Sequence, residues 1–317
     1  MKRTLLVGTI LALFSAASAA QYPTKPVKLI VPFPPGGAAE LGARIFAQPL
    51  GQQLGQPVVI ETRPGADGII ASQAVKQAAP DGYTLYYGTA TGMSYVPAVK
   101  KVPPYDPVAD FTPVSLVGIF GFFVFSHPSI PANNLADFIA YVRANPGKLN
   151  YGSGNATSIL TTAQFAALQK LDMLHVPYKG DGPLSADLLG GRVQLAFATP
   201  GVLAPQVKEG KLRALATLLP SRSPLLPDAP TFAEAGVAPV TITPWGGVFG
   251  PAKMPKEVVD RVGRELAVVL AKPEVKDAFA KLAFETKSST PQELSHFVVE
   301  QLEAYRRVAQ QVGISLD

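Results

Sequence analysis

The segment KLIVPFPPGGAAELGAR, residues 28–44, decides the fold at the start of this chain. Its β-forming residues Leu29–Val31 end at a proline cluster, and the pair Gly36–Gly37 then precedes good helix formers up to Arg44. This order predicts a strand, a glycine turn and the N-terminus of a helix. Because the first N–H groups of a helix lack intrahelical partners and carry about half a positive charge, such a turn favours an anion. The same segment also fits an ordinary turn between a strand and a helix.

The first 20 residues have the composition of an export signal. Lys2 and Arg3 precede an apolar run from Leu5 to Phe14, and Ala17–Ala19 fits a small-residue cleavage site. The apolar run is shorter than the roughly 18 residues that a membrane anchor needs. We therefore expect cleavage near residue 19 or 20, and a periplasmic mature protein in a bacterium with two membranes.

Composition excludes several classes of protein. The 297 residues after the expected signal carry 26 Lys and Arg against 23 Asp and Glu, without a basic stripe, which argues against nucleic-acid binding. The chain has no cysteine, so thiol nucleophiles, cysteine-bound zinc and disulfides are excluded. This length suits one large domain or two ordinary ones.

Strand-like and helix-like segments alternate along the chain, which predicts parallel sheets covered by helices. In the first part we expect strands at 27–32, 58–61 and 84–88 and helices at 38–54 and 69–79. A long apolar run, 116–126, is interpreted as a strand that crosses into a second unit with the same rhythm. The chain returns at a strand at 245–250, before long amphipathic helices at 255–271 and 291–311. The expected division is residues 21–124 and 245–317 for domain 1 and 125–244 for domain 2, with a cleft between them.

Small and polar residues follow four of the expected strands. These loops are 34–38, 88–92, 152–158 and 198–201. In open α/β sheets, ligands bind beyond the carboxyl ends of the strands. Loops that offer backbone N–H groups and Ser, Thr and Asn side chains predict a site for a small polar anion.

Catalytic and cofactor motifs are absent from the sequence. Ser153 lies in a Gly-Ser-Gly turn, but no Gly-x-Ser-x-Gly elbow is present. The histidines His127, His175 and His296 are far apart, so we expect neither a nucleophile–base pair nor a zinc site. No phosphate-binding loop or dinucleotide fingerprint occurs, so no cofactor is expected.

Two pairs of carboxylates were considered for acid–base roles. Neither Glu61 with Asp67 nor Asp181 with Asp187 lies in a context that separates an acid from a base. Both pairs are interpreted as solvated surface charge.

Six motifs, in the same order, resemble one family of receptors. Residues 34–40, PPGGAAE, are similar to its Pro-Gly-Gly-x-x-Asp turn, and residues 61–68, ETRPGADG, to its Glu-Asn-Arg-Pro-Gly-Ala-Gly-Gly loop. Four further matches are YDPVADFTPV (105–114), HVPYKG (175–180), GKLRALA (210–216) and WGGV (245–248). Over essentially the whole mature chain, the sequence resembles the extracytoplasmic receptors of tripartite tricarboxylate transporters, the Bug receptors.

This resemblance implies a two-domain periplasmic-binding-protein fold of type II, the Venus flytrap, that closes on a carboxylate. It implies permease subunits as partners, a monomer, and a site without a metal or catalytic residue. The ligand-binding residues carried over are Phe33, Gly36, Gly37, Ala38, Thr89 and Thr91 in domain 1, and Ser153, Gly154, Asn155, Ala156, Thr157 and Thr199 in domain 2.

Several positions depart from the family pattern. Glu40 replaces the usual Asp and is a poorer helix cap, while Ile159 and Ala163 replace a His and a Glu, and Ala198 replaces a frequent Asp. A less charged pocket favours a carboxylate with an aromatic or longer aliphatic body. Two other functions remain open: a sensing subunit for a signalling partner, and an exported hydrolase.

Overall fold

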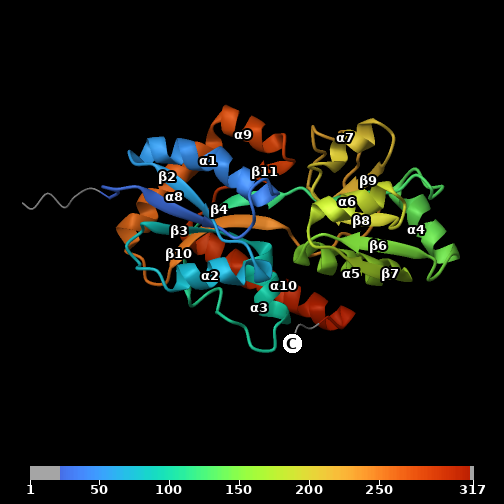
Figure 1. The fold of residues 1–317 in the computed structure, drawn as a ribbon, viewed down its shortest axis with the longest axis horizontal. Helices are drawn as coiled ribbons and strands as arrows, with labels where there is room; N and C mark the ends of the chain where they lie inside the picture. The colour runs from blue at the N-terminus through green and yellow to red at the C-terminus, as the bar shows by residue number, and fades with distance from the viewer. Residues whose placement is uncertain (1–21, 315–317) are drawn as a thin grey trace, which may run out of the picture.

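The computed structural model describes residues 22–314, which form two α/β units side by side (Figure 1). The predicted export signal lies outside the described residues. Within 22–314, none of the helices has the length and apolar character required to cross a membrane.

The first unit is built on a six-stranded sheet in the order β11-β4-β10-β3-β1-β2. β1 pairs in parallel with β2 and β3, whereas β10 runs antiparallel to β3 and β4. The strands are β1 (Val27–Val31), β2 (Val58–Thr62), β3 (Thr84–Thr89), β4 (Phe111–Phe120), β10 (Trp245–Pro251) and β11 (Phe284–Thr286).

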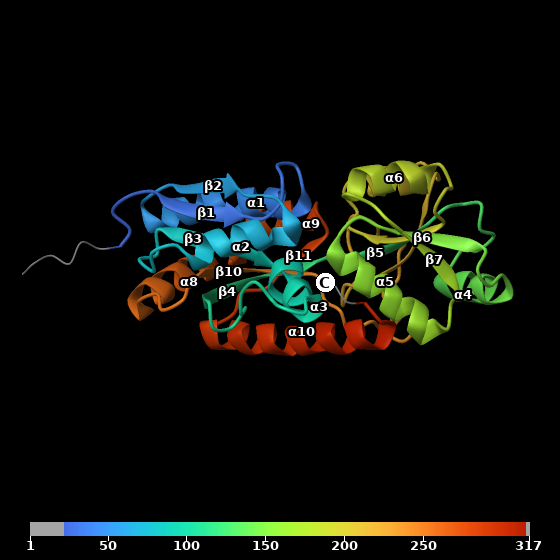
Figure 2. The same cartoon turned by 60° about the horizontal axis from the view of Figure 1, so that its bottom comes forward.

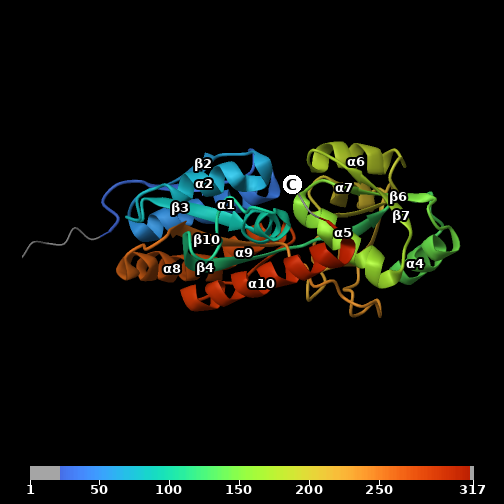
Figure 3. The same ribbon diagram turned by 90° about the horizontal axis from the view of Figure 1, so that it is seen from below.

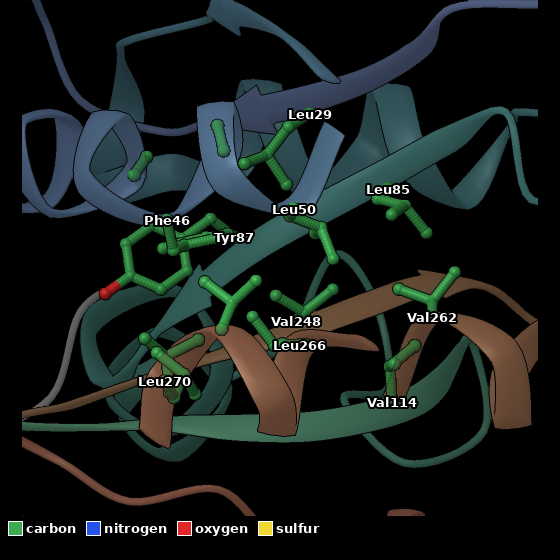
Figure 4. Close-up of a cluster of buried hydrophobic side chains, with 14 of the residues drawn as sticks. Leu29, Phe46, Leu50, Leu85, Tyr87, Val114, Val248, Val262, Leu266 and Leu270 are labelled. Atoms are coloured by element: carbon green, nitrogen blue, oxygen red, sulfur yellow. The ribbon is translucent and has the colours of Figure 1, made fainter. Parts of the chain in front are cut away.

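Helices cover both faces of this sheet, because successive side chains of a strand point to opposite faces. Leu85 and Tyr87 face α1 (Ala38–Leu54), α8 (Lys256–Ala271) and α9 (Pro273–Ala280), as Figure 4 shows for α1 and α8. Tyr86, between them, faces the opposite cluster. That second face carries α2 (Ile69–Lys76), α3 (Val96–Val99) and α10 (Pro291–Val312), together with the short turns η1 (Ala66–Gly68) and η2 (Thr91–Tyr95).

The second unit is built on a five-stranded sheet in the order β7-β6-β8-β5-β9. Its strands are β5 (Phe123–Ser126), β6 (Leu149–Ser153), β7 (Met173–Pro177), β8 (Leu195–Ala198) and β9 (Arg213–Thr217). One face packs against α4 (Leu135–Ala144) and α5 (Ala156–Gln169), and the other against α6 (Asp181–Leu189) and α7 (Leu203–Lys208).

Two crossings and one long helix connect the units. α10 runs along the first unit and reaches α5 of the second (Figures 2 and 3). The long apolar run at 116–126 is two strands in two different sheets, since β4 ends at Phe120 and β5 begins at Phe123. Gly121 lies between them and donates its N–H to Ala283 O at 2.7 Å, where an added Cβ would lie 2.3 Å from that oxygen.

The predicted α/β alternation is confirmed, and most predicted elements match within about two residues. The prediction of parallel sheets is wrong in part: both sheets are mixed, because β10 is antiparallel to β3 and β4 in the first and β5 is antiparallel to β8 and β9 in the second. The division at residue 124 stays a prediction, although the change of sheet occurs earlier, at Gly121–Phe122. The sequence analysis missed α9 and β11. β11 has three residues and exists through its pairing with β4, which a local pattern does not reveal.

Candidate ligand pocket

A pocket of about 470 Å³ lies between the two units and is lined by residues of both. This volume is in the range of small-molecule sites. The pocket lies at the carboxyl ends of β1, β3, β6, β7 and β8, because the segment after each of these strands contributes to its lining. The four loops that the sequence analysis singled out all contribute to it.

Helix N-termini from both units converge on this pocket. α1 contributes 34–39 from the first unit, and α5, α6 and α7 contribute residues near 154–157, 180–182 and 201–203 from the second. Each N-terminus presents N–H groups without intrahelical partners and a partial positive charge. Helix N-termini in this arrangement favour an anion, and the described lining residues include no Lys, Arg or His.

The glycine turn before α1 is held by its own helix. Gly36 has a φ of +83° and donates its N–H to Glu40 Oε2 at 3.0 Å, and Gly37 donates to Pro34 O at 3.3 Å. Glu40 is 1% exposed and also forms an ion pair with Arg44. Glu40 thus accepts the N–H of Gly36 in the turn and caps no N–H of the helix, so the Gly36 N–H already has a partner within the chain.

At the start of α5, polar side chains form hydrogen bonds, some of which cap the helix, and Asn155 and Thr157 also line the pocket. Asn155 Oδ1 accepts the N–H of Ser158 at 3.0 Å, and Ser158 Oγ accepts the N–H of Asn155 at 3.3 Å, which forms a capping box. Thr157 Oγ1 lies 3.2 Å from Thr91 Oγ1, so this hydrogen bond joins the two units at the edge of the pocket.

Two of the twelve candidate residues, Ser153 and Ala156, are not among the residues that line the pocket; the other ten are. Ala156 packs in the hydrophobic cluster under α10. Ser153 is 1% exposed, and its Oγ lies 2.6 Å from His175 Nε2.

This Ser153–His175 contact bears on the expectation that no nucleophile–base pair is present, because it brings a serine hydroxyl to a histidine ring nitrogen. His175 lies on the edge strand β7 and stacks on Tyr151, and burial lowers its pKa. The serine is buried outside the pocket lining, and no described carboxylate is hydrogen-bonded to His175. The pair therefore joins two neighbouring strands, and a substrate in the pocket would not contact it.

Asp181 corrects a second expectation. It opens α6 and lines the pocket, where Oδ2 accepts a hydrogen bond from Thr199 Oγ1 at 3.2 Å and Oδ1 is buried without a partner. Burial raises the pKa of this carboxyl, while the polar side chains of Thr199 and Asn155 beside it oppose the rise. Asp187 does lie at the surface, paired with Arg192 at 2.6 Å. The position of Asp181, first in a helix after a strand, was a signal that the sequence analysis did not use.

Apolar side chains form much of the remaining wall. Besides the expected Phe33, they include Phe120 and Phe122 at one crossing, Trp245 at the other, and Leu282. Besides Asp181 Oδ1, two polar atoms of lining residues, Trp245 Nε1 and Thr89 Oγ1, are buried without a hydrogen-bond partner. No group of three or more His, Asp or Glu able to hold a metal ion occurs within residues 22–314.

Comparison with known proteins identifies relatives along nearly the whole chain. A profile described as tripartite tricarboxylate transporter family receptor matches residues 42–314. The chain belongs to this receptor family. The receptor is similar to Protein BugT of Bordetella pertussis, with 33% identity over 306 residues that cover 94% of this chain and 93% of that protein.

Solved structures agree with this assignment and with the flytrap fold. Rpa4515 of R. palustris, described with adipate, has a TM-score of 0.83 and 33% identity, over 93% of this receptor and 99% of that chain. MatC (Rpa3494) from Rhodopseudomonas palustris, described with bound malate, has a TM-score of 0.78 and 29% identity, over 90% and 99%. Both are carboxylate complexes on the fold of this receptor, whose two α/β units enclose the pocket.

Proposed function

We propose that this receptor captures a small organic carboxylate with an aromatic or longer aliphatic body and delivers it to the permease subunits of a tripartite transporter. The convergence of helix N-termini from both units on one pocket carries this proposal. Fixed N–H groups would replace the water around the carboxylate, and the phenylalanines at the crossing would contact the body of the ligand. The adipate and malate complexes of the two R. palustris proteins support the ligand class.

Closure of the two units would enclose the ligand. The connection between them is narrow at Phe120–Phe122 and Pro244–Trp245, and residues at both crossings line the pocket. Hinge motion about a few residues at element ends is a common mode of closure. With an N-terminus typical of an export signal, the receptor would act in the periplasm, as a monomer and without catalysis.

Direct titration of the purified protein tests the ligand class. We expect heat of binding by isothermal titration calorimetry with adipate-length aliphatic or aromatic carboxylates, and weaker binding of malate and citrate. Binding of malate and citrate in preference to apolar acids would contradict the proposed apolar preference. Absence of binding by every carboxylate would contradict the receptor function itself.

A charge placed at the α1 N-terminus tests the location. Ala38→Asp adds a carboxylate where helices favour one, so the fold should be retained. The added charge should weaken carboxylate binding by about 100-fold or more, because juxtaposing like charges costs several kcal/mol. Ile70→Asp adds the same charge on the exposed face of α2 and serves as the matched control. Equal affinities of the two variants would place the ligand elsewhere.

Delivery is tested in cells. Deletion of the receptor should abolish uptake of the labelled ligand, and the full-length chain should restore it. Unchanged uptake would favour a sensing role, because sensing uses the same binding chemistry.

A further inference from the structure

The second unit places a carboxyl group of its own at the point where its helix N-termini line the pocket. Asp181 is the one ionisable side chain among the described residues that line the pocket. Its neighbours there are the start of α5, the start of its own helix α6, and Thr199 after β8. In the first unit, the carboxylate of Glu40 is bonded to Gly36 and paired with Arg44, and Glu40 is not a lining residue.

We propose that Asp181 makes this receptor selective for monocarboxylates whose far end carries a hydrogen-bond donor, an ammonium or hydroxyl group, and makes it discriminate against dicarboxylates of the same length. The ligand carboxylate is held at the α1 N-terminus, and the donor faces Asp181. This inference rests on the proposed function and specifies its ligand class.

The geometry fixes the carboxyl group in place. A Cβ added at Gly154 would lie 2.3 Å from Asp181 Oδ1 and 3.1 Å from the Asp181 backbone N. The carboxyl group therefore packs directly against the bare backbone before α5, while Thr199 Oγ1 donates to Oδ2 at 3.2 Å. Oδ1 retains an acceptor position that no described group fills.

A buried carboxyl group such as that of Asp181 would select among ligands by their charge and by their hydrogen-bond donors. A buried acceptor without a partner gains a hydrogen bond when a ligand brings a donor. A second carboxylate at the same place would meet a like charge, and no lining cation among the described residues would compensate it. The α5 and α6 N-termini, which would otherwise attract the far carboxylate of a dicarboxylate, already face Asp181.

The test uses two sets of ligands that differ only at the far end. The aliphatic set is hexanoate, 6-hydroxyhexanoate, 6-aminohexanoate and adipate, and the aromatic set is benzoate, 4-hydroxybenzoate, 4-(aminomethyl)benzoate and terephthalate. Affinities are measured by calorimetry for the wild type, Asp181→Ser and the surface control Asp187→Ser. Comparison of the hydroxyl and ammonium members identifies which donor the pocket takes.

We expect the wild type to bind a donor-bearing member at least tenfold more tightly than the dicarboxylate of its set. Asp181→Ser should reverse this order, with tighter binding of the dicarboxylate and weaker binding of the donor-bearing acid. Asp187→Ser should keep the wild-type order. Asp181→Asn keeps a neutral acceptor, so it should retain binding of the hydroxyl member and lose the preference for ammonium.

Two outcomes separate failure of this inference from failure of the proposed function. A wild type that binds adipate or terephthalate as tightly as the donor-bearing acids, with an order unchanged by Asp181→Ser, overturns the inference and leaves the receptor function intact. A folded wild type that binds none of the eight compounds overturns the proposed function, and the inference with it. Thermal unfolding of each variant establishes that it is folded, and Asp181→Asn replaces the serine variant if that one unfolds.

Discussion

Glu40→Ala should loosen the glycine turn before α1 and weaken ligand binding, whereas Arg44→Ala should do neither. Glu40 accepts the N–H of Gly36 at 3.0 Å and pairs with Arg44, so the alanine variant at position 40 loses both interactions. Arg44→Ala loses only the ion pair. Comparison of the two variants therefore isolates the contribution of the hydrogen bond that holds the turn.

The expected magnitudes follow from burial. A hydrogen bond to a charged group contributes about 1.5–3 kcal/mol, and Glu40 is 1% exposed, so we expect Glu40→Ala to lower the free energy of unfolding by about 2 kcal/mol. Only the Arg44 end of the ion pair is exposed, at 62%, and in Arg44→Ala the buried Glu40 keeps its hydrogen bond from Gly36, so we expect a smaller loss of stability than for Glu40→Ala, of about 1 kcal/mol. Ordering one residue costs about 1–2 kcal/mol, so a ligand that must reorder the turn should bind Glu40→Ala roughly tenfold more weakly.

Chemical denaturation and calorimetry on both variants measure these quantities. The denaturation midpoint should fall further for Glu40→Ala than for Arg44→Ala, and only the former should lose affinity. If Glu40→Ala unfolds and binds as Arg44→Ala does, then Glu40 does not hold the turn. If it is destabilised but binds as the wild type does, then the turn is not part of the carboxylate site.

Three further predictions concern other residues of the pocket. Gly154→Ala should weaken ligand binding by about tenfold or more in calorimetry, because its Cβ would lie 2.3 Å from Asp181 Oδ1 and displace that carboxyl; wild-type affinity would refute this contact. Burial raises the pKa of Asp181, so its ionisation costs stability as pH rises, and Asp181→Asn should raise the melting temperature more at pH 8 than at pH 4; a gain independent of pH would contradict this. Trp245 is the single tryptophan and lines the pocket, so saturating ligand should change the intrinsic fluorescence, and an unchanged spectrum would place the ligand elsewhere.

Much of the fold could be predicted because the signals that determine it are local. α1 begins and ends where predicted, at Ala38 and Leu54, since the glycine pair precedes it and Gly55 terminates it in a left-handed conformation. The run at 116–126 could not be divided in advance, because its apolar residues are buried in both sheets. The break at Gly121 depends on the carbonyl of Ala283, more than 160 positions later in the chain.

The sequence predicted where the site lies in the fold, but only some of the groups that a ligand could contact there. Ligands bind beyond the carboxyl ends of the strands in open α/β sheets, which predicted the loops around Gly36 and Asn155 as parts of the site, and the resemblance to the receptor family implied that they face each other; both line the pocket. Which atoms are available to a ligand depends on hydrogen bonds that residue spacing alone does not reveal: Glu40 accepts the Gly36 N–H, and the Ser153 hydroxyl is hydrogen-bonded to His175.

Asp181 shows why ligand selectivity is harder to predict than ligand class. Helix N-termini attract anions whatever their side chains are, so backbone geometry alone predicts a carboxylate site. Selectivity depends on whether one particular carboxyl points to solvent or to the pocket, and for Asp181 this is decided by the absence of a side chain at Gly154 and by the hydroxyl of Thr199. These residues lie on three different loops and meet only in the folded chain. On the proposed role of Asp181, one substitution at the start of α6 would change the ligand of this receptor while the other helix N-termini around the pocket stay the same.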